Sequence, residues 1–431
     1  MNTLTRRKFL QTTALGAAGF WITTTQTTFG RALSPNEKLN IGVLGVSGRA
    51  GDDLHEVSGE NIVALCDVDD TKLQAAAPKY PQAKTYNDFR ELIDQKDIDA
   101  IVIGTPDHTH AVAAVAAIKS GRHVYCEKPL AHTVSEARII TDLARKEKRV
   151  TQLGTQIHAG NNYRRVVELV QSGAIGPVRE VHVWAATRYG GKELPKETPP
   201  VPAGLHYDLW LGPVPYRPYH QAYLPFWWRD WWAFGGGTLA DFGCHFMDLP
   251  YWALGLRAPL TIEVVDGPPV HPESTPPWLI VRYEYPARDP QPAVKLTWYQ
   301  GGKHPEMLTP EQYQQYKSGV LFVGEKGSLL SHYTSHMLLP EKDFTDFTPP
   351  QPFIQNSIGH HKEWILACKT DGPTTCNFDY SGPLTEAALL GNVAYRVGKK
   401  LEWDAKKLKA GNCPEADQFI QHHYREGWKL G

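Results

Sequence analysis

The stretch Leu39-Asn40-Ile41-Gly42-Val43-Leu44-Gly45-Val46-Ser47-Gly48-Arg49-Ala50-Gly51 decides the fold of this 431-residue chain. Its first six residues are mostly apolar and end at turn glycines, which predicts a buried strand. A helix is predicted from Arg49 to Val57, and a second strand over residues 61–67. Strand, glycine turn, helix and strand together predict a βαβ unit whose turn binds the pyrophosphate of a dinucleotide.

An acid at the end of the second strand favours NAD as that dinucleotide. Asp67 follows Gly45 at about the 20-residue spacing of a carboxylate that binds the ribose hydroxyls, and it would repel the 2′-phosphate of NADP. The fingerprint is imperfect, because Ser47 and Ala50 replace glycines, and Arg49 leaves NADP open as the less favoured cofactor. The cofactor-binding candidates in this unit are Gly45, Ser47, Gly48, Arg49 and Asp67.

A lysine is predicted at the mouth of the same crevice. The apolar run from His123 ends in Cys126-Glu127-Lys128-Pro129, and residues at the carboxyl ends of parallel strands line the ligand crevice. Pro129 biases Lys128 towards an extended conformation. Lys128 is therefore a catalytic candidate, and Glu127 and Lys128 are cofactor-binding candidates.

The strand Ala100–Ile103 is expected to open onto the same crevice through Gly104-Thr105-Pro106-Asp107-His108-Thr109-His110. A helix is predicted after it, from about 111 to 120. The two histidines are interpreted as loop or helix-cap residues near the nicotinamide rather than metal ligands, and no metal site is predicted. This segment adds Thr105, Pro106, His108 and His110 to the cofactor-binding candidates.

A second constellation lies far downstream, in Gly235-Gly236-Gly237-Thr238-Leu239-Ala240-Asp241-Phe242-Gly243-Cys244-His245-Phe246-Met247-Asp248. Asp241 and His245 share one face of a helix, and Asp248 is expected further along the same side. The alternative reading is a helix-cap acid and a buried structural histidine. Just upstream, Arg229 and Asp230 are expected to meet polar groups of a ligand.

Together these motifs resemble the Gfo/Idh/MocA (glucose–fructose oxidoreductase / inositol dehydrogenase) family over nearly the whole chain after residue 37. The resemblance implies that Lys128, Asp241 and His245 fall on the family's catalytic lysine, aspartate and histidine. The substrate-binding candidates are Lys128, Gln156, Arg229, Trp232, Asp241 and His245. Further motifs that carry the resemblance are Leu153-Gly154-Thr155-Gln156, Asp208-Leu209-Trp210-Leu211-Gly212-Pro213 and His360-His361-Lys362-Glu363-Trp364.

The predicted fold class is α/β with two domains. A Rossmann NAD-binding domain is expected over residues 37–155. The resemblance implies a substrate-binding and oligomerisation α/β domain over 156–431, with a large, mostly antiparallel sheet. It also implies a homodimer or homotetramer and a saccharide or cyclitol as small-molecule partner.

The residues 1–33 are predicted to be a twin-arginine signal segment. Thr5-Arg6-Arg7-Lys8-Phe9-Leu10 precedes a mildly apolar region, Ala14 to Ile22, that is too short to span a bilayer. Such signals are read by the export machinery, so the predicted location is the periplasm, with cleavage after Ala32 or a retained membrane tether as alternatives. A net charge of −1 gives no electrostatic case for nucleic acid.

Export shapes the functional hypothesis, because an exported protein that releases NAD loses it. The chain is expected to oxidise a secondary hydroxyl of a sugar, glycoside or cyclitol with tightly bound NAD. His245 is the first choice of general acid/base, Lys128 the second, and Asp241 would orient His245 or hold a substrate hydroxyl. The alternatives are redox-neutral glycoside cleavage through a transient keto-sugar and a non-catalytic saccharide-binding protein.

Two further groups of residues are left with open readings. Aromatic side chains upstream of Asp241 would form a saccharide wall, a hydrophobic core or an oligomer interface; they are Tyr207, Trp210, Tyr223, Phe226, Trp227, Trp228, Trp231 and Trp232.

The six cysteines do not form a disulfide framework. Cys66, Cys126 and Cys244 are expected as buried thiols, whereas Cys368 and Cys376 are close enough in sequence to bridge.

Overall fold

The computed structural model describes residues 37–430, so the signal segment predicted over residues 1–33 lies outside the described residues. The first domain is a sheet of six parallel strands in the order β3-β2-β1-β4-β5-β6. The β1 strand is buried from Ile41 to Leu44 because sheet neighbours and helices cover it on both faces. The predicted Rossmann domain is therefore confirmed. Its strands are β1 (Asn40–Leu44), β2 (Asn61–Cys66), β3 (Lys84–Tyr86), β4 (Ala100–Ile103), β5 (His123–Cys126) and β6 (Thr151–Leu153), and its helices are α2 (Arg49–Glu56), α3 (Asp70–Ala76), α4 (Phe89–Asp94), α5 (Asp107–Lys119) and α6 (Val134–Lys146).

One helix of this domain begins earlier than predicted. The sequence analysis placed the start of α5 near residue 111, but the helix begins at Asp107, directly after Pro106. Proline suits this place because it has no N–H to satisfy and its φ is already close to helical. His108 and His110 are therefore buried helical residues and not loop residues.

The second domain is built on a nine-stranded sheet in the order β13-β12-β11-β7-β10-β9-β8-β14-β15. The β7–β10 pair is parallel and the other recorded pairs are antiparallel, which confirms the mostly antiparallel sheet. Its strands are β7 (Val178–Ala185), β8 (Thr261–Asp266), β9 (Leu279–Tyr285), β10 (Val294–Gln300), β11 (Gly319–Gly324), β12 (Ser328–Ser331), β13 (His336–Leu339), β14 (Leu401–Asp404) and β15 (Lys409–Ala410), and its helices are α7 (Asn161–Gln171), α8 (Tyr207–Leu211), α9 (Gly237–Phe246), α10 (Asp248–Leu254), α11 (Pro310–Gln315), α12 (His360–Thr370), α13 (Phe378–Val397) and α14 (Asp417–Ile420).

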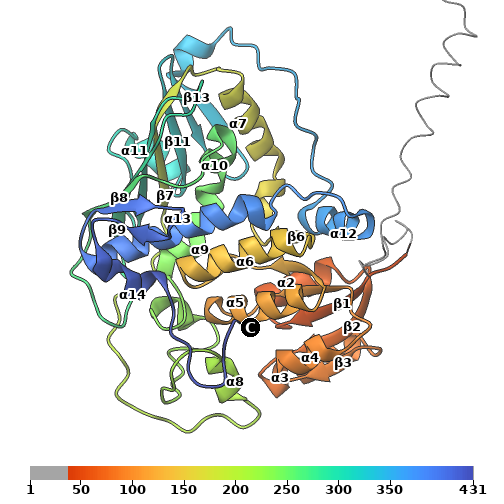
Figure 1. Ribbon diagram of the computed structural model, residues 1–431. Helices are drawn as coiled ribbons and strands as arrows, with labels where there is room; N and C mark the ends of the chain where they lie inside the picture. The colour runs from red at the N-terminus through yellow and green to blue at the C-terminus, as the bar shows by residue number, and fades with distance from the viewer. Residues whose placement is uncertain (1–36, 431) are drawn as a thin grey trace, which may run out of the picture. The chain divides into compact units, whose positions relative to one another are not determined.

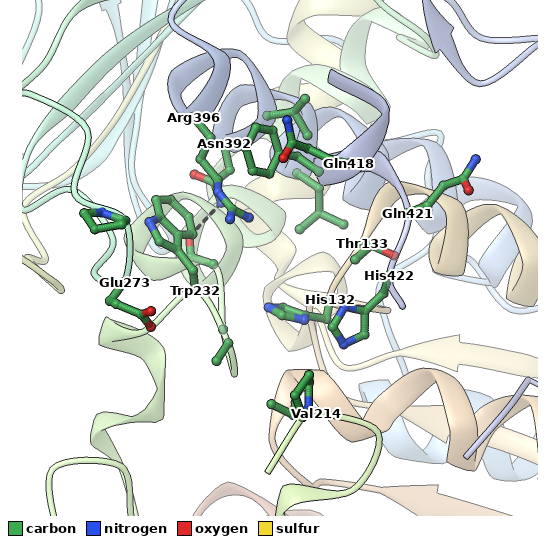
Figure 2. A pocket seen from close by; sticks show the side chains of 18 of the residues that line it. His132, Thr133, Val214, Trp232, Glu273, Asn392, Arg396, Gln418, Gln421 and His422 are labelled. Atoms are coloured by element: carbon green, nitrogen blue, oxygen red, sulfur yellow. Dashed lines mark hydrogen bonds between the residues drawn. The ribbon is translucent and has the colours of Figure 1, made fainter. Parts of the chain in front are cut away.

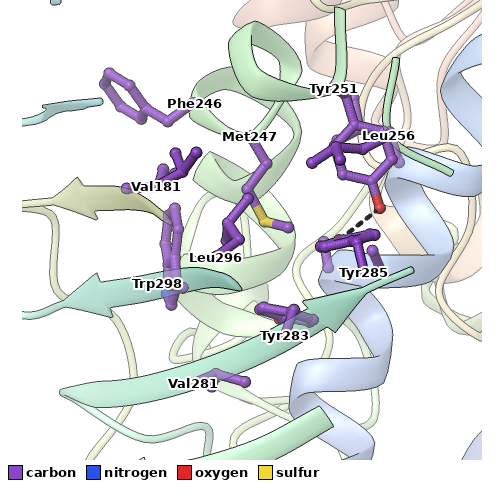
Figure 3. Close-up of a cluster of buried hydrophobic side chains, with 14 of the residues drawn as sticks. Val181, Phe246, Met247, Tyr251, Leu256, Val281, Tyr283, Tyr285, Leu296 and Trp298 are labelled. Atoms are coloured by element: carbon purple, nitrogen blue, oxygen red, sulfur yellow. Dashed lines mark hydrogen bonds between the residues drawn. The ribbon is translucent and has the colours of Figure 1, made fainter. Parts of the chain in front are cut away.

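A hydrophobic core joins this sheet to the helices that cover it. Alternate residues of β9 are buried, as expected for a strand with one face on a core. Figure 3 shows Leu296 and Trp298 of β10 facing Phe246 and Met247 at the end of α9. The helix that carries the Asp241/His245 pair is thus fixed to the sheet at its C-terminal end.

The chain returns to the first domain near its C-terminus. Trp364 of α12 is fully buried in the Rossmann core, where its ring meets Tyr125 of β5 edge-on at 5.7 Å. Phe378, at the start of α13, is buried in a second cluster of that domain. α13 then runs along α6 (Figure 1). Part of the stretch predicted as the second domain therefore completes the core of the first.

All six cysteines are buried and free. Cys66, Cys126 and Cys244 are the buried thiols that the sequence predicts. Cys368 and Cys376 lie in two different hydrophobic clusters and do not form the bridge that their spacing would allow. Within residues 37–430, no helix has the length and apolar character needed to cross a bilayer.

We predict that Trp364→Ala destabilises the protein strongly, by about 3–5 kcal/mol, because it leaves a cavity inside the Rossmann core. Leu366→Ala on the same helix is the control. That side chain is 45% exposed, so its loss changes stability by only about 0.5 kcal/mol. Urea unfolding of both variants measures the difference. Equal effects would contradict the packing of α12 on the first domain.

Candidate active site

A cavity of about 740 Å³ lies at the carboxyl ends of the Rossmann strands and is closed by residues of the second domain. It is large enough for a dinucleotide's reactive half and a small substrate, since ligand cavities run from about 300 to 1,000 Å³. Most of the predicted site residues line it: Gly45, Ser47, Gly48, Arg49, Asp67, Thr105, Pro106, Glu127, Lys128, Gln156, Arg229, Asp241 and His245.

The glycine turn has the geometry that a dinucleotide requires. Gly45 has φ of 85° and Gly48 of 58°, a region in which other residues are strained. A Cβ on Gly45 would also come within 3.1 Å of the carbonyl oxygen of Gly104, the residue that follows β4. Backbone and cavity therefore meet without intervening side chains, directly before α2. The residues present fit the pyrophosphate of NAD.

Asp67 stands at the end of β2, where the ribose of such a nucleotide lies. Its carboxylate accepts hydrogen bonds from the backbone N–H of Val46 at 3.1 Å and of Asp69 at 3.0 Å. Burial raises its pKa, and these two hydrogen bonds oppose that effect. The carboxylate is thereby held rigidly at the cavity edge.

Arg49 is engaged elsewhere, which bears on the choice between NAD and NADP. Its guanidinium bonds Asp53 at 2.9 Å and lies 3.5 Å from Glu127. Because both carboxylates are buried, withdrawing this cation towards a 2′-phosphate would remove the arginine's charge from both and leave them only their contacts with His361 and Gln156. The geometry therefore favours NAD.

The catalytic candidates meet across the two domains. The Lys128 ammonium, after β5, donates a hydrogen bond to the carboxylate of Asp241 on α9. Arg229 Nε lies 3.2 Å from the same carboxylate oxygen. Burial alone would raise the pKa of Asp241, but the charges of Lys128 and Arg229 outweigh it and hold that pKa well below its usual value. Asp241 is thus a permanent anion between two cations.

His245 lies one helical turn after Asp241 and lines the cavity. Burial, followed by the charge of Lys128, lowers its pKa to about 3. Its Nδ1 is buried and has no hydrogen-bond partner. At neutral pH the ring is therefore an uncharged imidazole, the form that can accept a proton.

Two residues of the site were missed by the sequence analysis. Asp107 is buried at the start of α5 and lines the cavity, and burial together with the nearby charge of Asp241 raises its pKa well above the usual value. Tyr189 follows β7 and lines the same cavity, where burial, followed by the charge of Asp241, raises its pKa. Asp107 could have been found from its place beside Thr105 and Pro106, but no local signal marks Tyr189.

Three predicted ligand-binding residues do not reach the cavity. Nε2 of His108 lies 2.7 Å from the carbonyl oxygen of Trp210, and the two ring nitrogens of His110 lie 2.7 Å from the carbonyl oxygens of Pro129 and Thr105. These contacts fix α5 to its neighbours behind the cavity. Trp232, predicted to bind substrate, lines a different cavity.

Two acids near the site have structural partners instead. Asp230, expected to meet a ligand, is 1% exposed, accepts the N–H of Gly190 at 2.6 Å and lies 2.6 Å from Lys192 Nζ. Asp248, expected on the side of Asp241 and His245, starts α10 and accepts hydrogen bonds from Tyr380 at 2.7 Å and His158 at 2.9 Å. The break between α9 and α10 at Met247 turns Asp248 away from the cavity.

The aromatic side chains divide between core and cavity. Tyr207, Trp210, Tyr223, Trp228 and Trp231 are buried in one cluster around Phe234. Trp210, Phe226 and Trp228 also border the cavity, and the Arg229 guanidinium stacks over Trp228 at 4.1 Å. A cation held over an aromatic ring beside the Asp241 carboxylate gives the cavity a wall that is both apolar and polar.

The Rossmann domain with its glycine turn and the second domain with its large mixed sheet define a two-domain dinucleotide-binding protein. Comparison with protein families agrees: residues 39–155 match the oxidoreductase family model with an NAD-binding Rossmann fold, and residues 159–430 match that family's C-terminal α/β domain. The chain belongs to the Gfo/Idh/MocA oxidoreductase family, and its first domain is the family's NAD-binding domain.

Individual relatives are distant. The chain is 35% identical over 150 residues to inositol 2-dehydrogenase of Salmonella typhimurium, covering 33% of this chain and 45% of the relative. It is 30% identical over 195 residues to a glycosyl hydrolase family 109 protein of Solibacter usitatus, covering 41% and 44%. The chain thus spans under half the length of these curated relatives. The Bordetella pertussis WlbA dehydrogenase, solved with NADH and UDP-GlcNAcA, shares the fold with a TM-score of 0.59 and 17% identity, covering 85% of this chain and 99% of that one.

The state of His245 is directly measurable. We predict that its imidazole stays neutral down to about pH 4 in the folded protein, because burial and Lys128 lower its pKa to about 3 from 6.5. Below pH 6.5 the unfolded chain therefore binds a proton that the folded chain does not, so His245 contributes a loss of stability as the pH falls from 6.5 towards 3. In Lys128→Met the pKa rises. Histidine-selective NMR follows it, and titration of His245 near 6.5 in the wild type would contradict this assignment.

Proposed function

We propose that this protein is an NAD-dependent oxidoreductase that acts on a secondary hydroxyl of a saccharide or cyclitol. The observation that carries the proposal is the meeting of Lys128, Asp241 and His245 at the nucleotide cavity. A paired ammonium and a neutral imidazole are what removal of a hydroxyl proton requires. The names of the Salmonella relative, an inositol dehydrogenase, and of the sugar nucleotide bound by the Bordetella protein support this substrate class.

NAD, when bound, supplies the acceptor for the hydride that leaves the substrate carbon. The chain's own residues then handle the proton. An ammonium has three donors, and the Asp241 carboxylate takes one from Lys128, which leaves others for the substrate oxygen. Lys128 thereby stabilises the developing alkoxide, and neutral His245 takes the hydroxyl proton. Asp241, itself paired with Arg229, holds Lys128 in place.

The location of this reaction is also a proposal. The twin arginines Arg6 and Arg7 support export of the folded protein, and an exported enzyme must keep its NAD through each cycle. The cavity is compatible with such retention, because residues of both domains line it.

A redox-neutral cleavage is the second candidate function. The match to a glycosyl hydrolase family 109 protein favours it. Oxidation of a ring hydroxyl acidifies the neighbouring C–H, so a leaving group is eliminated and the hydride is later returned. The same Lys128 and His245 serve both routes. A non-catalytic saccharide-binding protein is the third candidate, but it needs no proton-transfer set.

One experiment separates the three. The purified, folded protein is treated with acid, the released nucleotide is quantified by mass and absorbance, and the untreated protein is incubated with a panel of saccharides, glycosides and cyclitols. A product lacking two hydrogens supports oxidation, and a split glycoside supports the redox-neutral route. A protein that neither releases NAD nor binds it would refute the enzyme proposal.

Lys128 gives the sharpest test of the mechanism. We predict that Lys128→Ala lowers kcat by about 10²- to 10⁴-fold. The developing alkoxide loses its hydrogen-bond donor, and the proton transfer to His245 loses the positive charge beside it. NAD stays bound, since the glycine turn is unchanged. Lys146→Ala, which removes an exposed ammonium, is the control and keeps full turnover. Steady-state turnover and acid-released NAD are measured on both variants. Unchanged turnover in Lys128→Ala would exclude this role.

Export has its own test. We predict that replacing Arg6 and Arg7 together by lysine confines the protein to the cytoplasm with its folded core and NAD content unchanged, because a receptor reads the arginine pair. Cell fractionation followed by immunoblotting measures the distribution. Equal periplasmic amounts of the variant and the wild type would argue against the twin-arginine route.

A further inference from the structure

A second cavity, of about 290 Å³, lies behind the glycine turn that precedes α9. Figure 2 shows the side chains of His132 and His422 together on one side of it, with Asn392 and Arg396 of α13 and Trp232 opposite. It shares no lining residue with the larger cavity that contains Lys128. It is therefore a separate site within the described part of the chain.

Three polar side-chain atoms around this cavity lack hydrogen-bond partners. Asn392 is buried, with 7% of the residue exposed. Its Nδ2 donates to the carbonyl oxygen of Gly236 at 2.8 Å, which fixes the amide orientation and leaves Oδ1 as an acceptor without a donor. Nδ1 of His132 and Nε2 of His422 are also buried and unpaired. Three unpaired buried polar groups around one cavity are costly unless a ligand or water satisfies them.

The cavity also carries an excess positive charge. The Arg396 guanidinium lies 4.0 Å from the ring of Phe419 and 5.0 Å from that of Trp232, and no carboxylate of the described residues forms an ion pair with it. Glu273, the acid that lines the cavity, is paired with Arg217 at 3.2 Å. Burial lowers the pKa of Arg396 to about 10, so the guanidinium still carries its charge at neutral pH.

We propose that this cavity is a second small-molecule site and that it binds a hydroxylated carboxylate of sugar-acid type. The ligand's carboxylate pairs with the guanidinium of Arg396, the planar group that suits bidentate recognition. Its hydroxyls donate to Oδ1 of Asn392 and bond the two histidine nitrogens. Chloride would satisfy the arginine but could not donate to Asn392, and inorganic phosphate, whose P–OH groups can donate, has no apolar face for the Trp232 ring. The volume suits one monosaccharide unit, and the Trp232 ring offers an apolar wall.

The site lies against both segments that carry the catalytic pair. His132 follows Lys128 on the loop that leads to α6, and Gly236 directly precedes the helix of Asp241. The proposal does not depend on the reaction catalysed in the larger cavity, because its residues are distinct. Binding can therefore be tested on protein whose turnover is unknown or abolished.

The experiment measures binding of D-gluconate to the NAD-loaded protein by isothermal titration calorimetry, with neutral sorbitol as the matched polyol. Wild type binds gluconate and not sorbitol, and Arg396→Met weakens gluconate binding about 10- to 100-fold because the charge-assisted bonds are lost. Methionine keeps an apolar side chain between the two rings. Arg145→Met, at an exposed arginine, is the control and binds like the wild type.

Lys128→Ala separates the two cavities. Gluconate binding that survives in Lys128→Ala and is lost in Arg396→Met supports the second site, and Asn392→Leu gives the same loss through the hydroxyl contact. Melting temperature and NAD content establish that each variant is folded. No binding to the wild type, equal binding of sorbitol, or binding that is lost only with Lys128 would each overturn the proposal.

Discussion

The buried carboxylate of Asp241 lies between two cations, Lys128 from the first domain and Arg229 from the second. A buried charge is tolerated only when its partners are held in good geometry. Loss of one partner leaves the other charge unpaired in an environment of low dielectric. The position of β5 relative to α9 is therefore fixed by electrostatics as well as by packing. The glycine turn, the aromatic wall and His245 are all arranged around this cluster.

The same charges determine the chemistry available. Burial, with the charge of Lys128 as a second cause, lowers the pKa of His245 and keeps the imidazole neutral, while Lys128 and Arg229 keep Asp241 ionised. Base, cation and anion are thus present together at neutral pH without any group titrating. Asp107 adds a second buried carboxyl whose raised pKa reflects the neighbouring anion as well as burial. His245, Asp241 and Asp107 lie in one cavity, but their different surroundings shift their pKa values in different ways.

Sequence reasoning succeeded where local pattern and function coincide. The βαβ unit, the strand-end Lys128 and the spacing of Asp241 and His245 on one helix are local features, and the structure brings them to one cavity. It failed where the deciding contacts are long-range. The residues next to Asp230 in the sequence do not indicate that its carboxylate accepts the N–H of Gly190 and pairs with the Lys192 ammonium.

The aromatic stretch shows the same limit, and it also borders the second cavity. Trp231 is 1% exposed in a core cluster, yet its neighbour Trp232 lines the second cavity, beside the Gly235–Gly236 turn that precedes α9. A Cβ on Gly236 would come within 2.9 Å of Asn392 Nδ2, so glycine is needed where this turn approaches α13. Arg396 and Asn392 of α13 face the second cavity with unmatched charge and hydrogen-bonding capacity. α13 thus lines this cavity with groups suited to an acidic, hydroxylated ligand.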